Sequence, residues 1–130
     1  MDIFFRDPTD IPLPPEQVRI RRFHAEPWAD GRRVSITLEL TPFLKRPNGE
    51  ITITDGRGVE AASLDIIETM DPRLEFTIHL RGAALESPFT VAAAIFYLEE
   101  PETPAEDLQA DLETRPRRVV DQAETTFQIP

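Results

Sequence analysis

Residues 50–60, EITITDGRGVE, carry the alternation that decides the fold. Successive side chains of a β-strand point to opposite faces, so an apolar residue at every second position predicts a strand with one buried face. Asp55-Gly56 between two such runs is a strong signal for a hairpin turn. A second glycine, Gly58, follows at once and indicates a loop of more than two residues.

The parity of the apolar positions sets the expected length of this loop. In an antiparallel pair, residues that lie opposite each other share a face of the sheet. Four apolar side chains must then share the buried face: Ile51, Ile53, Val59 and Ala61. They do so only across an odd loop, either 54–56 with a left-handed Gly56 or 54–58 with Gly58 at the second bend. Arg57 is expected near its tip.

The same alternation recurs along the chain and predicts an all-β fold. We expect one strand beginning at residue 18 and six more near 34–40, 50–54, 59–69, 74–80, 89–98 and 119–129. Glycine, proline, asparagine and aspartate fall between these runs, where turns require them. Short strands at this spacing favour a seven-stranded antiparallel sandwich of two sheets.

Four segments resemble the strands of a broad family. PLPPEQVRI, ITITDGRGVE, LEFTIHL and SPFTVAAAIFY resemble the first, middle and late strands of bacterial immunoglobulin-like and fibronectin type III-like sandwiches, across residues 12–129. The chain departs from that pattern in having no cysteine pair and in placing Trp28 in a turn-like PWADG. The resemblance implies a binding or spacing role, although a fold by itself does not fix a function.

Composition excludes several classes of function. The 130 residues include no cysteine, so a disulfide framework, a thiolate metal site and a cysteine nucleophile are excluded. The net charge of −10 argues against general nucleic-acid binding, because phosphates require a surplus of cations. No apolar run is long enough to span a membrane, and the N-terminus lacks the basic start and apolar run of a signal peptide. We therefore expect a cytoplasmic protein that binds neither nucleic acid nor membrane.

One predicted strand breaks the alternation. In FTVAAAIFYL, residues 89–98, the even positions are as apolar as the odd ones. The second face carries Ala92, Ala94, Phe96 and Leu98, and a strand that is apolar on both faces must be covered on both. We expect the cover to come from this chain or from another subunit.

A short helix is the first candidate for that cover. Thr103 as the N-cap and Pro116 as the stop predict a helix over residues 104–114, within an acidic insert at 99–117. Leu108 and Leu112 are four residues apart and lie on one helical face.

The N-terminal arm, residues 1–17, is the second candidate. Ile3, Phe4 and Phe5 make this segment too apolar for an ordinary disordered tail. The prolines that follow make it unsuited to a central strand. We expect it to dock on its own sandwich domain, residues 18–130, or on the sheet edge of a neighbour.

No catalytic constellation is visible, and neither a cofactor nor a metal is expected. The two histidines, His24 and His79, lie on different predicted strands, and the three serines have no nucleophile-elbow context. We favour a non-catalytic structural or interaction module that binds itself or a partner protein through the apolar strand face and the arm. The alternative is a carbohydrate-binding type of domain, with Trp28, Tyr97 and Arg57 at its site.

Overall fold

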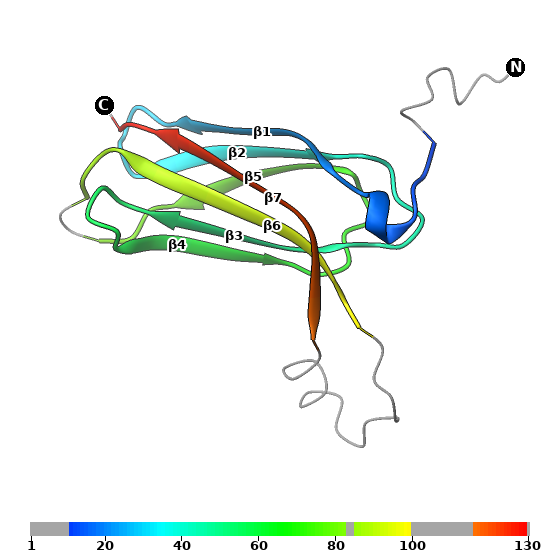
Figure 1. Ribbon diagram of the computed structural model, residues 1–130. Coiled ribbons are helices and arrows are strands. Elements are labelled where there is room, and N and C mark those ends of the chain that lie inside the picture. Colours follow the sequence, from blue (N-terminus) through cyan, green and yellow to red (C-terminus); the bar gives the residue numbers. More distant parts are fainter. Residues whose placement is uncertain (1–10, 83–84, 100–115, 130) are drawn as a thin grey trace, which may run out of the picture.

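The chain forms two antiparallel β-sheets packed face to face (Figure 1). The computed structural model describes residues 11–82, 85–99 and 116–129. Its strands are β1 (Ile20–Pro27), β2 (Arg33–Leu40), β3 (Asn48–Thr54), β4 (Glu60–Ile66), β5 (Arg73–His79), β6 (Phe89–Leu98) and β7 (Arg117–Phe127). One sheet has the order β1-β2-β5 and the other β4-β3-β6-β7. The predicted all-β class with seven strands in two antiparallel sheets is confirmed.

Helix is limited, within these ranges, to the 3-10 turn η2 (Pro15–Gln17). The predicted helix at 104–114, with Leu108 and Leu112, lies outside the described residues, as do Ile3, Phe4 and Phe5. The first strand begins at Ile20 rather than at Val18, because the chain leaves η2 at Val18, whose side chain is fully buried. Before η2, Leu13 forms a parallel bridge with Phe43 and donates its N–H to the Pro42 carbonyl at 3.0 Å.

The hairpin between β3 and β4 has a loop of odd length, but its register differs from the expected one. Thr54 pairs with Glu60, which leaves a five-residue loop at 55–59, and Val59 is exposed. The register then shifts, since Ile53 pairs with Ala62 and Ala61 is the extra residue of a bulge. Beyond the bulge the even positions of β4 face the core. Because Val59 lies in the loop, ahead of the bulge, the prediction that it shares the buried face of β3 was wrong.

Two glycines are needed in this loop for different reasons. Gly58 has a φ of +84°, in the left-handed region that side chains disfavour. Gly56 lies against the segment before β6, where a Cβ atom would come within 2.8 Å of the Ser87 carbonyl oxygen. The sequence pattern identified the turn but assigned the left-handed conformation to Gly56 in its three-residue version.

The core lies between the inner faces of the two sheets. Its fully buried side chains come from alternate positions of both sheets: Val34, Ile36, Leu38 and Leu40 on β2, Ile51 and Ile53 on β3, and Phe89, Val91 and Ile95 on β6. At one end of the core, Phe89 stacks on Phe127 with ring centroids 5.0 Å apart. Apolar burial of this kind is the main stabilising term of a domain without disulfides.

Polar contacts join the two sheets along their edges. The backbone N–H of Ile20, in β1, donates to Oδ2 of Asp121, in β7, at 2.8 Å. Near the opposite edge, the N–H of Arg81 donates to the carbonyl of Ala61 at 2.9 Å. These contacts use backbone groups that the ladders of the two sheets leave unpaired.

The same isoleucine-to-alanine change at a buried and at an exposed position should show how much burial in the core contributes to stability. Ile51→Ala removes a fully buried side chain and should lower the free energy of unfolding by about 2–5 kcal/mol. Ile67→Ala makes the same chemical change at a side chain that is 79% exposed, and should stay within about 0.5 kcal/mol of the parent. Urea unfolding of the two variants measures the difference, and equal losses would contradict the core assignment.

Candidate functional site

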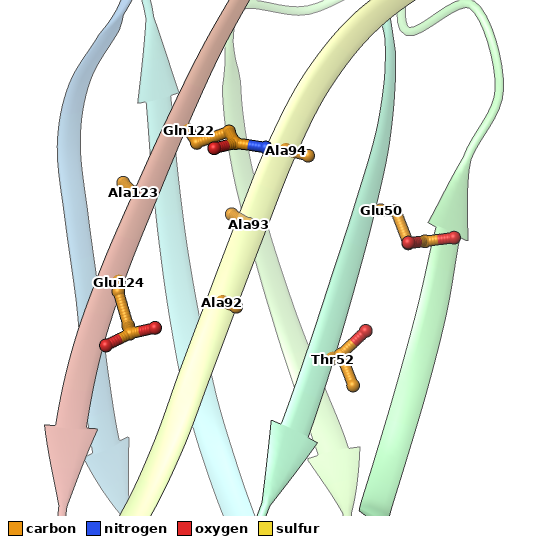
Figure 2. Close-up of a pocket in the computed structure, with 8 residues that line it drawn as sticks. All are labelled: Glu50, Thr52, Ala92, Ala93, Ala94, Gln122, Ala123 and Glu124. Carbon is orange, nitrogen blue, oxygen red and sulfur yellow. The ribbon is translucent and has the colours of Figure 1, made fainter. Parts of the chain in front are cut away.

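The outer face of the four-stranded sheet contains a shallow trough. On β6 the odd residues point into the core, and the even residues Ala92, Ala94 and Phe96 point outward. Ala92 is exposed and Ala94 is half-buried, so the middle of this strand presents only methyl groups. The longer side chains of β3 and β7 stand on either side (Figure 2).

Strand register sets the walls of this alanine trough. Ala94 pairs with Glu50 on β3 and Gln122 on β7, while Ala92 pairs with Thr52 and Glu124. The hollow between them has a volume of about 430 Å³. Alanine has a low preference for strands, so two neighbouring outward alanines in a central strand give up cross-strand packing that threonine or valine would supply.

Carboxylates dominate the electrostatics of the trough. Glu50 and Glu124 flank the alanines, and Asp65 follows on β4 beside Glu50. Arg117 bounds one end, where its Nη1 lies 3.4 Å from Oε2 of Glu50. The middle of the face is therefore acidic, with one guanidinium at its edge.

The same arginine covers the apolar residue beyond the alanines. The Arg117 guanidinium carbon lies 4.3 Å from the ring centroid of Phe96, and Phe96 is only 6% exposed. Leu98 is half-buried at the end of the strand. The sequence indicated that Phe96 needs a cover, but it did not indicate that Arg117 contributes to that cover. A register shift in β7, between the partners of Ile95 and Phe96, sets the position of this arginine.

The three residues expected at a carbohydrate site do not lie together. Trp28 follows β1 and Arg57 lies in the β3–β4 loop, both at one end of the sandwich, whereas Tyr97 is near the end of β6, at the other (Figure 1). Trp28 is 37% exposed, while Tyr97 is buried and donates its hydroxyl to the Lys45 carbonyl at 2.8 Å.

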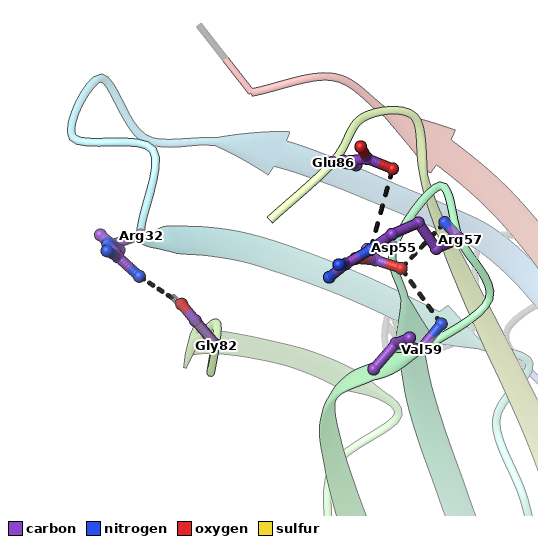
Figure 3. Close-up of polar contacts among 6 residues, drawn as sticks. All are labelled: Arg32, Asp55, Arg57, Val59, Gly82 and Glu86. Carbon is purple, nitrogen blue, oxygen red and sulfur yellow. Dashed lines mark hydrogen bonds and ion pairs between the residues drawn. The ribbon is translucent and has the colours of Figure 1, made fainter. Parts of the chain in front are cut away.

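Arg57 is engaged within its own loop (Figure 3). Its Nη2 and Nε donate to Oδ2 of Asp55 at 2.8 and 3.0 Å, while Oδ1 of Asp55 accepts from the backbone N–H groups of Arg57 and Val59. Glu86, from the segment before β6, lies 3.7 Å from the Arg57 guanidinium. This arrangement ties the hairpin tip to the β5–β6 connection.

The Asp55 carboxyl gains a pH-dependent role from these contacts. Burial acts to raise its pKa, but the hydrogen bonds from the Arg57 side chain and from the backbone N–H groups of Val59 and Arg57 outweigh burial and lower the pKa below its usual value. A lowered pKa in the folded state stabilises the fold above the unfolded pKa of about 3.9, and this contribution is lost as pH falls through the folded value.

Asp55→Asn should therefore have a lower free energy of unfolding than the parent at neutral pH. The difference in free energy between the two proteins should become smaller below about pH 4. Urea unfolding at a series of pH values measures it. Arg57→Gln, which keeps the carboxylate and removes its side-chain ion pair, should show a smaller loss of the same sign. A gap that stays constant into strong acid would contradict the role of this carboxylate.

Tyr97 provides a second, independent titration. Burial raises the pKa of its phenol to about 12, although the positive charge of Arg118 partly opposes the shift. Because Tyr97 is the single tyrosine, absorbance should show one phenol transition well above the usual value of about 10. The stabilising effect of the neutral phenol should be lost as pH rises between these two values, and a normal transition in the folded protein would contradict its burial.

Metal and membrane features receive no support within the described ranges. No group of three or more histidine, aspartate or glutamate side chains is gathered there as metal ligands would be. His24 and His79 are both exposed, on β1 and β5. No described helix has the length and apolarity to cross a bilayer.

Comparison with known proteins identifies a fold but no family. No protein-family model matches the sequence, and no curated protein matches it either. The β-glucuronidase of Bifidobacterium dentium, in complex with coumarin-3-O-glucuronide, is similar with a TM-score of 0.51 and 19% identity, over 86% of this chain and 18% of that one. The β-glucuronidase of Ruminococcus gnavus gives a TM-score of 0.44 and 9% identity, over 87% and 16%.

This chain therefore spans less than a fifth of the length of those enzymes. The likeness to the Bifidobacterium protein supports a β-sandwich-like fold and extends no further, because 19% identity carries no function.

Proposed function

We propose that the chain is a non-catalytic interaction module with an immunoglobulin-like, fibronectin type III-like sandwich, and that it docks a protein partner on the alanine trough. The strand orders β1-β2-β5 and β4-β3-β6-β7 support that topology. The alanine trough is the observation that carries the function, because its methyl floor lets another backbone approach closely between two taller rows of side chains.

The partner's chemistry follows from the walls. Glu50, Asp65 and Glu124 favour lysine or arginine side chains, while Ala92 and Ala94 favour a narrow apolar ridge. A second copy docked by the same face would place these carboxylates opposite one another, and like charges disfavour that arrangement. An extended basic segment of another protein therefore fits the trough better than self-association does.

A non-catalytic role is supported by the way the described polar groups are used. Asp55, the most buried carboxylate of the described ranges, is engaged by Arg57 in holding its own loop. The structural neighbours are enzymes, but they match this chain over a small part of their length. That is consistent with a sandwich that accompanies other domains.

Filling the trough tests this function. Ala94→Tyr places a strand-compatible aromatic on an outward position, so the fold should persist while the floor is blocked. The matched control is Thr77→Tyr on β5, an exposed position of the other sheet. The immobilised parent and the control should both retain a basic protein from an extract of the source cell. The amount retained by immobilised Ala94→Tyr should be lower by about tenfold or more. High salt should release the retained protein, because it screens the carboxylates.

Two results would overturn the proposal. Equal retention by all three proteins would show that the trough is not used. If light scattering shows that the isolated parent self-associates and that Ala94→Tyr is a monomer, the occupant is a second copy rather than a basic partner.

A further inference from the structure

The single tryptophan is fixed on the outer face of the three-stranded sheet. The indole Nε1 of Trp28 donates to Oγ of Ser35, on β2, at 2.8 Å. The guanidinium carbon of Arg33 lies 4.0 Å from the ring centroid, and its Nε is held 2.7 Å from Oδ2 of Asp30. Trp28 is 37% exposed, so it is a positioned surface aromatic rather than a plug of the core.

A polar hollow lies beside this tryptophan. It has a volume of about 250 Å³ and is lined by the outward side chains of Ser35 and Thr37 on β2 and Glu75 and Thr77 on β5, above Ile36 and Phe76. Ser35 pairs with Thr77 and Thr37 with Glu75, so three hydroxyls and a carboxylate stand on two strands about 4.8 Å apart. The Trp28 hydrogen bond to Ser35 joins the aromatic ring to this polar group.

Beside the hollow, β1 presents further polar groups on the same outer face. His24 pairs with Thr37 and Glu26 with Ser35, and the Nε2 of His24 lies 3.8 Å from the carboxylate of Glu26. Glu75, the charged residue of the lining, lies 3.5 Å from Nη2 of Arg73, and Arg33 lies over the Trp28 ring at the other end. This hollow therefore lacks the single sign of charge that the alanine trough has.

The combination determines the class of ligand. Hydroxyl groups donate and accept hydrogen bonds, the carboxylate accepts them, and an indole ring offers a flat apolar surface. A sugar ring presents the complementary features, with hydroxyls at its rim and C–H groups on its faces. Mixed charge favours a ligand without net charge. We propose that the outer face of β1-β2-β5 is a binding site for a neutral oligosaccharide, with Trp28 as its aromatic platform and Ser35, Thr37, Glu75 and Thr77 as its polar contacts.

Preorganisation strengthens this assignment. The tryptophan is held by a hydrogen bond and by a stacked guanidinium, and the hydroxyls project from paired strands, so little freedom is lost when a ligand binds. The hollow is shallow and open, so we expect dissociation constants on the order of millimolar. This site lies on the opposite face of the sandwich from the alanine trough, and it does not depend on the proposed protein partner.

The single tryptophan serves as the reporter of binding. Titration of the parent with maltoheptaose, cellohexaose or xylohexaose should change Trp28 fluorescence in a saturable way for at least one of them, and calorimetry should give the same affinity. Thr77→Tyr should fill the hollow and weaken binding about tenfold or more. Ser35→Ala should weaken it several-fold, because the indole loses its hydrogen bond.

Ala94→Tyr is the matched control, and it should bind the oligosaccharide as the parent does while losing the protein partner. Measuring Thr77→Tyr and Ala94→Tyr in both the oligosaccharide titration and the protein-retention assay shows which surface each ligand uses. Absence of saturable binding for all three oligosaccharides would overturn the inference. Binding that survives Thr77→Tyr unchanged, or that is lost equally in Ala94→Tyr, would also overturn it.

Discussion

The pleat of paired strands is the constraint on which the rest of the structure depends. Each strand sends alternate side chains to opposite sides, so one register fixes the core and the outer faces together. Between β3 and β6, the pairing of Ile51 with Ala93 places both in the core. The same register sets Glu50 beside Ala94 on the outside. A slip of one residue would exchange the two sets and bury the carboxylate.

The two outer faces differ because their side chains differ in length and charge. The larger sheet presents short methyl groups between carboxylates, while the smaller sheet presents hydroxyls beside an indole. Apart from Trp28, which follows β1, the side chains of both surfaces come from strands, so ladder hydrogen bonds hold their backbones. A rigid backbone suits recognition, because less conformational entropy is lost on binding.

The sequence predicted the fold well because period-two apolarity is a local signal. It indicated the seven strands and also the outward apolar set at Ala92, Ala94 and Phe96. It failed where contacts between distant segments decide the geometry. Val59 is exposed because the loop runs as far as the pairing of Thr54 with Glu60 and so includes it. Gly56 is required because Ser87 approaches from 31 residues away in the chain.

The candidate sites were predictable only in part, for the same reason. Trp28 could be singled out as the single tryptophan, but its partner Ser35 and the neighbouring Thr77 depend on cross-strand pairing. Tyr97 and Arg57 looked equivalent to it in the sequence. In the structure Tyr97 supports the β2–β3 connection and Arg57 supports its own hairpin.

The two sheets lie back to back, about 10 Å apart across the core. Occupants of the two outer surfaces would not collide, and a single copy would hold both at once. With both proposed surfaces occupied, the domain would act as an adaptor that holds a protein and a glycan on opposite sides of one two-layered sandwich. Tethering of this kind raises the local concentration of each occupant near the other without any direct contact between them.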